Sequence, residues 1–199
     1  MGGSTAHGGS FERFAGWASV LAGVAGIGYA VAFVVLKNAS LSAQFLTLAP
    51  LFAVGGLVAV YERVRTIDSG YATVALGLGV FGSLAASSHG VYDLANALHP
   101  PASIPDVPFA VDPRGYGTFA LTGLSLLILA RLAGRAANLP AWVSPLGIVL
   151  GVVLVITFLA RLVIVDATSV LVLGPALVAG LLSPIFFLLL GAWLLGWRR

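Results

Sequence analysis

The stretch 87–96, SSHGVYDLAN, holds the residues whose types and spacing could do chemistry. His89 and Asp93 are four residues apart and Asn96 follows three later, so a helix would place all three on one face, with Tyr92 beside it. An imidazole next to a carboxylate can hold a proton, an ion or a polar ligand, and imidazole changes charge near neutral pH. Because the stretch ends a long apolar run, these groups would be costly to bury unless they had partners.

Further charged residues are expected at the same depth. They are Asp112, Arg114, Arg161 and Asp166. The sequence favours a pair between Asp93 and Arg161, or an Arg161 that Asp166 shares, because an isolated charge there is expensive. Three interpretations stay open: an interhelical ion-pair network, an outward-facing pocket for a ligand, ion or proton under the connection 99–114, and a catalytic site.

The elements that must position these residues are membrane spans. Of the 199 residues, 59% are hydrophobic and 9% are charged, and the mean hydropathy is +1.05. A soluble domain carries about 25% charged residues, so this chain has too few charges for a water-facing surface. We therefore expect an integral membrane protein whose main partner is the lipid bilayer. The basic residues sit at the ends of the apolar stretches, so the net charge of +3 predicts no nucleic-acid partner.

Six stretches are long enough to cross a hydrocarbon core of about 30 Å. They are about 15–36, 41–61, 71–96, 113–133, 141–164 and 170–196. The predicted fold is an all-α bundle of six transmembrane helices that forms one domain, 13–199, after a disordered cytoplasmic tail, 1–12. The one long connection, 99–114, contains five prolines, which cannot continue a helix. Most of it is the predicted outer loop, 99–112.

Local signals mark where several helices begin. Ser40 is a plausible N-cap for the second span, Asp68 or Ser69 for the third, and Asn138 for the fifth. In the fourth, Asp112 would cap a helix that starts at Pro113.

Lysine and arginine predict the orientation. With the N-terminus inside, the inner side holds seven of them and the outer side three. The inner residues are Arg13, Arg63, Arg65, Arg131, Arg135, Arg198 and Arg199; the outer ones are Lys37, Arg114 and Arg161. This asymmetry favours two cytoplasmic termini. Nine of the ten basic residues are arginines, as is common in high-GC bacterial genomes, so we expect a multi-pass protein of a bacterial inner (plasma) membrane.

Small residues recur every fourth position in the first span, at Ala18, Ala22, Gly26 and Ala30. Such a face lets helix backbones approach closely in lipid. It predicts packing within the bundle or, alternatively, a docking face for another subunit or a second copy.

Specific chemistries find little support. The chain has no cysteine, and His89 is the one histidine inside a span, so neither haem nor a zinc site is expected. Its single lysine, Lys37, ends a helix and cannot hold retinal. No catalytic motif is present. We therefore expect no cofactor, no metal and no enzymatic activity.

The segments SSHGVYDLANALHPP and DPRGYGTFALTGLSLLILARL resemble small bacterial multi-pass membrane proteins of families without an assigned function. This resemblance covers about a quarter of the chain and implies no catalytic residues. The architecture also resembles the substrate-binding subunits of energy-coupling-factor vitamin transporters. Those subunits dock through an A-x-x-x-A pattern in their first helix, which Ala18 to Ala22 fits, although the first outer connection is shorter here.

The sequence thus predicts a non-enzymatic bacterial membrane protein that serves as a subunit or accessory of a membrane complex. The alternative is a small transporter or ligand-binding protein with an outward-facing polar pocket under the connection 99–114.

Overall fold

The computed structural model describes residues 8–100, 113–164 and 169–197, and every regular element in these ranges is helical. The elements are α1 (Gly8–Ala30), the π-helical turn η1 (Val31–Val35), α2 (Ala39–Val64), α3 (Ser69–Leu98), α4 (Pro113–Ala133), α5 (Val143–Val163) and α6 (Val170–Leu194). The protein is an all-α polytopic bundle, as the sequence predicted.

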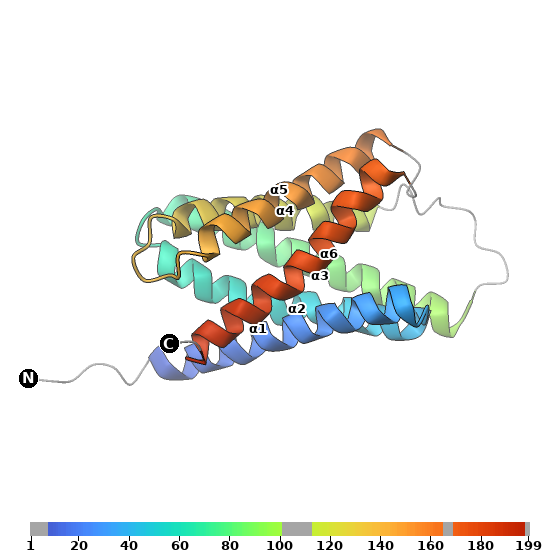
Figure 1. The fold of residues 1–199 in the computed structure, drawn as a ribbon, viewed down its shortest axis with the longest axis horizontal. Coiled ribbons are helices and arrows are strands. Elements are labelled where there is room, and N and C mark those ends of the chain that lie inside the picture. The colour runs from blue at the N-terminus through green and yellow to red at the C-terminus, as the bar shows by residue number, and fades with distance from the viewer. Residues whose placement is uncertain (1–7, 101–112, 165–168, 198–199) are drawn as a thin grey trace, which may run out of the picture.

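Five of these helices are long and apolar enough to cross a membrane: α1 with η1, α2, α3, α5 and α6. The apolar part of α4 whose side chains the structure describes is Gly117–Ala133, which is shorter than these five spans. Helix α1 begins and α6 ends at the same end of the bundle (Figure 1). We call this the termini end, and the opposite end the far end.

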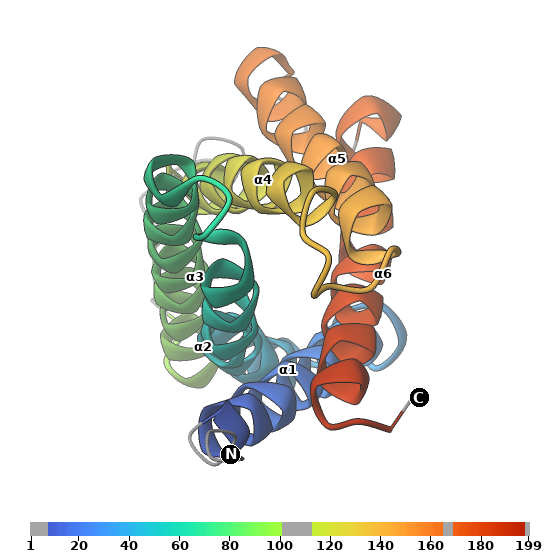
Figure 2. The same cartoon turned by 90° about the vertical axis from the view of Figure 1, so that its left-hand side faces the viewer.

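The helices follow one another around a ring (Figure 2). Each packs against its neighbours in the chain, and α1 closes the ring against α6. Helix α2 also contacts α4 and α6, so it fills part of the interior. The largest fully buried side chains include Leu57, Leu129, Leu150 and Leu190, which come from α2, α4, α5 and α6. In lipid such packing holds helices together mainly through van der Waals contact.

Glycines permit the closest helix contacts. A Cβ at Gly90 of α3 would lie 2.6 Å from the backbone nitrogen of Thr47 in α2, and one at Gly55 of α2 would lie 2.8 Å from the Ala18 Cβ. No larger residue fits at these distances without moving a helix.

Helix α1 starts earlier than the sequence suggested. It begins at Gly8, so residues 8–12 of the expected disordered tail are helical. Residues 8–12 lack the apolar run that predicts a span, but Glu12 forms an ion pair with Arg63 of α2 at 2.6 Å. This pair holds the first turns of α1 against the bundle. Residues 1–7 lie outside the described part of the chain.

The helix starts show which local signals operate. Asp68 caps α3, because its carboxylate accepts a hydrogen bond from the Tyr71 backbone N–H at 3.1 Å. The cap of α2 is Asn38, which accepts from the Leu41 N–H at 3.0 Å, so the expectation of Ser40 was wrong. Helix α5 is preceded by Trp142 without a side-chain cap, so Asn138 does not cap it.

Candidate functional site

The candidate site lies at the far end of α3, where His89 and Asp93 meet. The His89 Nε2 and the Asp93 Oδ2 are 3.4 Å apart, as the spacing of four residues on one helix predicts. The side chain of His89 is 13% exposed and that of Asp93 is 33% exposed. The imidazole is therefore shielded, while the carboxylate keeps one edge open to its surroundings.

Tyr29 of α1 belongs to the same site. It lies within electrostatic range of the Asp93 carboxylate and is half-buried. Its ring stacks on Phe33 with 5.7 Å between the ring centroids. Sequence reasoning missed Tyr29; the available signal was a tyrosine near the far end of an otherwise apolar span. We call His89, Asp93 and Tyr29 the far-end cluster.

The segment below the cluster is held firmly to α2. The Ser87 hydroxyl donates a hydrogen bond to the Thr47 carbonyl oxygen at 2.8 Å, and Gly90 lies against the backbone of the same residue. The register of α3 on α2 is thus fixed within one turn of His89.

The other predicted site residues on α3 stay near the cluster. Tyr92 is 43% exposed, and Asn96 is half-buried one turn beyond Asp93. Asn96 lies on the same helix face as His89 and Asp93, and Tyr92 lies beside that face, as expected from the spacing. Both residues lie at the far end of α3.

Arg161 is not brought to Asp93. It lies in the last turn of α5, and the far ends of α3 and α5 are well separated in both views (Figures 1 and 2). The salt bridges of the described residues do not include an Asp93–Arg161 pair. The fold gives this predicted pair no support, because α4 lies between α3 and α5 in the ring. The sequence indicates depth in the membrane but not position around the ring.

Three predicted site residues lie beyond what the structure describes. Asp112 and Asp166 are outside the described residues. Arg114 belongs to the first turn of α4, but its side chain is outside the description. The expectations that these residues join the site, and that Asp166 shares Arg161, stay predictions.

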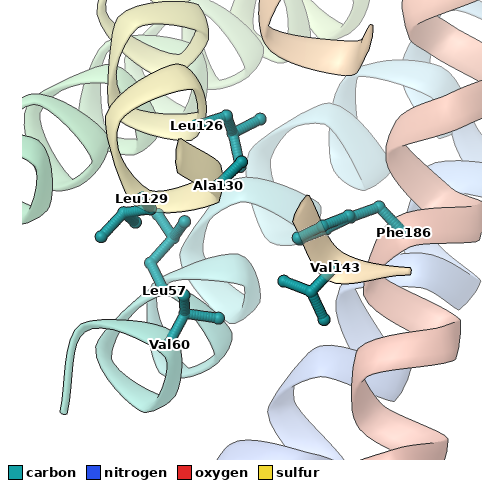
Figure 3. Close-up of a pocket in the computed structure, with 7 residues that line it drawn as sticks. All are labelled: Leu57, Val60, Leu126, Leu129, Ala130, Val143 and Phe186. Carbon is teal, nitrogen blue, oxygen red and sulfur yellow. The ribbon is translucent and has the colours of Figure 1, made fainter. Parts of the chain in front are cut away.

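The cavity between α2, α4, α5 and α6 is too small for a ligand. The cavity there has a volume of about 10 Å³ and is enclosed by seven apolar side chains (Figure 3): Leu57, Val60, Leu126, Leu129, Ala130, Val143 and Phe186. This volume is about that of a single water site, which needs polar partners that the lining lacks.

The small-residue face of α1 is used inside the bundle. Ala18 and Ala22 are buried, and Ala30 is half-buried. Ala18 lies against Gly55 of α2, and a Cβ at Gly26 would lie 2.8 Å from Pro184 of α6. The face therefore packs between α2 and α6, and another subunit could reach it only by displacing one of them.

Metal binding finds no support in the described residues, which contain no group of three or more histidine, aspartate or glutamate side chains that could hold an ion. No protein-family model matches the chain, and no curated protein or solved structure matches it either. The functional interpretation therefore depends on the geometry of the site.

Proposed function

We propose that this chain is a non-enzymatic protein of a bacterial inner membrane, with six spans and cytoplasmic termini, that binds a small cation at the far-end cluster. The observation that carries the proposal is the half-open Asp93 carboxylate, 33% exposed and 3.4 Å from a shielded imidazole. An ionisable group inside a membrane protein usually faces a functional path or site.

The surroundings of Asp93 suit a cation. Its carboxylate supplies the negative charge, and Tyr29 and Tyr92 bring aromatic rings to the same end of the bundle. Aromatic faces attract ammonium groups, most strongly where water is excluded. The imidazole of His89, 3.4 Å from the Asp93 carboxylate, lies on the same helix face and helps to define the site.

The test is thermal unfolding of the purified protein in sodium, potassium, methylammonium and tetramethylammonium chloride at one ionic strength. We expect the Tm of the wild type to be higher in at least one of these salts than in the others. In Asp93→Asn, the Tm should be the same in all four salts. Glu62→Gln, an exposed carboxylate at the termini end, is the control and should keep it. Identical responses of the wild type and Asp93→Asn contradict cation binding and favour a structural network.

A second role, as a subunit of a membrane complex, is favoured by the far half of α6. Val170, Leu171 and Leu181 are 80%, 69% and 63% exposed, and a Cβ at Gly174 or Gly180 would meet nothing within 4 Å. With α5, this segment projects sideways from the ring (Figure 2). Glycine on an open helix face allows a second helix to approach closely.

This second role is tested by crosslinking in native membranes, since the chain has no cysteine of its own. A Gly180→Cys variant should crosslink to a partner or to a second copy. Leu84→Cys, on the exposed face of α3, is the control. Equal crosslinking at both positions would indicate random collision in the membrane and remove the support for a subunit role.

A further inference from the structure

A hollow opens at the termini end, lined by residues of the α4–α5 connection and of the last turns of α6. Figure 2 shows that these two segments lie at the same end of the bundle. Its volume is about 570 Å³, within the range of about 300–1,000 Å³ typical of small-molecule sites. Its lining residues are Ala137, Asn138, Leu139, Pro140, Trp142, Leu189 and Trp193. We call it the termini-end hollow.

The lining of the hollow combines apolar and interfacial side chains. Leu139, Pro140 and Leu189 supply apolar surface, and Asn138 supplies an exposed amide. Trp142 and Trp193 are both half-buried. Tryptophan is enriched where the hydrocarbon meets the headgroups, because its ring is apolar and its N–H is polar. The hollow therefore lies at the depth where a lipid changes from chain to headgroup.

Tryptophan marks this end of the bundle throughout. The other two of the four tryptophans, Trp17 and Trp197, lie towards the same end and pack edge to face, with 5.4 Å between their ring centroids. Both are at least half exposed. This aromatic belt places the termini end at a membrane interface.

The charge beside the hollow is positive. Arg135 precedes its first lining residue, Ala137, by two positions, and Arg131 lies one turn earlier in the last turn of α4. Both arginines are exposed, and neither forms a salt bridge with a described residue. By contrast, Arg63, which lies over the Trp193 ring at 4.9 Å, is paired with Glu12. The chain just before the hollow's first lining residue thus carries two exposed guanidinium groups that form no salt bridge with a described acidic residue.

We infer that the termini-end hollow binds an anionic phospholipid from the surrounding leaflet. Its glycerol and upper acyl chain would lie on the apolar lining between Trp142 and Trp193, and its phosphate would accept hydrogen bonds from Arg131 and Arg135. Arginine recognises phosphate through two parallel N–H groups. Basic pockets beside transmembrane helices at the cytoplasmic side are a recurring form of lipid recognition.

Tryptophan fluorescence tests this inference directly. In a Trp17→Phe/Trp197→Phe background, the remaining emission comes from Trp142 and Trp193. The protein is reconstituted in mixtures of phosphatidylcholine and phosphatidylglycerol. In one series the phosphatidylglycerol is brominated, and in the other the phosphatidylcholine is brominated. Because bromine quenches only neighbouring indoles, the two series compare how often each lipid lies next to Trp142 or Trp193. We expect a preference for the anionic lipid of about threefold or more, since each basic residue near a membrane surface contributes appreciably to binding anionic lipid.

In the double variant Arg131→Gln/Arg135→Gln, the preference for the anionic over the neutral lipid should fall to a ratio of about one. Arg13→Gln is the matched control: this arginine is also exposed at the termini end and has no described salt bridge, but it is on α1. It should keep the preference. If the double variant does not fold, Arg135→Gln alone must lower the preference.

Three results would overturn the inference. Equal quenching by both brominated lipids in the parent protein excludes an anionic site, and an equal loss in Arg13→Gln indicates diffuse attraction to the surface. The third is displacement of the brominated lipid by millimolar glycerol phosphate, which would mean that a soluble phosphate, rather than a lipid, is the ligand.

Discussion

Arg63 shows how one charged residue can join three helices. Its guanidinium pairs with Glu12 of α1 at 2.6 Å, donates to the Ala59 carbonyl oxygen of its own helix at 2.9 Å, and lies over the Trp193 ring of α6 at 4.9 Å. The side chain is only 14% exposed. Arg65, two residues later, pairs with Glu62 on the surface, where both side chains are roughly half exposed.

These two arginines should therefore differ in their contribution to stability. Arg63→Gln removes a shielded, charge-assisted network and should lower the free energy of unfolding by about 2 kcal/mol. Arg65→Gln removes an exposed pair and should cost less than about 0.5 kcal/mol. Denaturant unfolding of both variants in one detergent measures the difference. Equal losses would mean that the contacts of Arg63 add nothing beyond an ordinary surface pair.

At the scale of the element, α3 approaches the backbone of α2 most closely at Gly90. A Cβ at Gly90 would lie 2.6 Å from the Thr47 nitrogen, which belongs to a helix backbone and cannot swing aside. Gly77, on the same helix, has nothing within 4 Å of the position of a Cβ. Gly90 is thus required for close helix packing, whereas Gly77 leaves room for a side chain.

Alanine substitution should separate them. Gly90→Ala is expected to push α3 from α2 and lower stability by about 1–3 kcal/mol, and to disturb the far-end cluster next to it. Gly77→Ala should be neutral or stabilising by up to about 1 kcal/mol, because alanine favours the helix. Thermal unfolding of the two variants decides the matter. A destabilised Gly77→Ala together with an unchanged Gly90→Ala would show that the described helix contact is wrong.

The elements also show what the sequence could and could not predict. Apolar length and charged breaks located the helices, and Asp68 was recognisable as a cap because its carboxylate needs only the next turn. The same reasoning chose Ser40, whereas Asn38 caps α2, since two neighbouring cap-formers cannot be separated by type alone. The five-residue π turn that ends α1 has no clear signal in VAFVV.

The candidate site divides in the same way. The His89–Asp93 contact is local and followed from a spacing of four residues. Tyr29 and Arg161 depend on which helices become neighbours around the ring, and that order is a property of the whole bundle. Reasoning from depth alone therefore could not show which helices lie next to α3, and it overlooked Tyr29 on α1.

At the scale of the whole molecule, the two ends of the bundle differ in charge and aromatic content. The sequence assigns the arginine-rich termini end to the cytoplasm. The absence of cysteine makes this assignment easy to test, since any introduced thiol is the only one in the chain.

A membrane-impermeant maleimide should label Ala39→Cys in intact cells, because this exposed residue lies at the far end. Thr66→Cys, exposed in the turn after α2, should react only after the membrane is permeabilised. Labelling of both variants in permeabilised cells is the control for thiol reactivity. The opposite pattern would invert the topology and place the far-end cluster inside the cell.

The closure of α1 against α6 has a consequence for how the chain is made. Gly16 of α1 and Gly191 of α6 approach so closely that a Cβ at Gly191 would lie 2.7 Å from the Gly16 carbonyl oxygen. Every other pair of neighbours in the ring is also adjacent in the chain, but four helices separate α1 from α6. The flank of α1 that packs on α6 therefore lacks its partner helix until α6 has been translated.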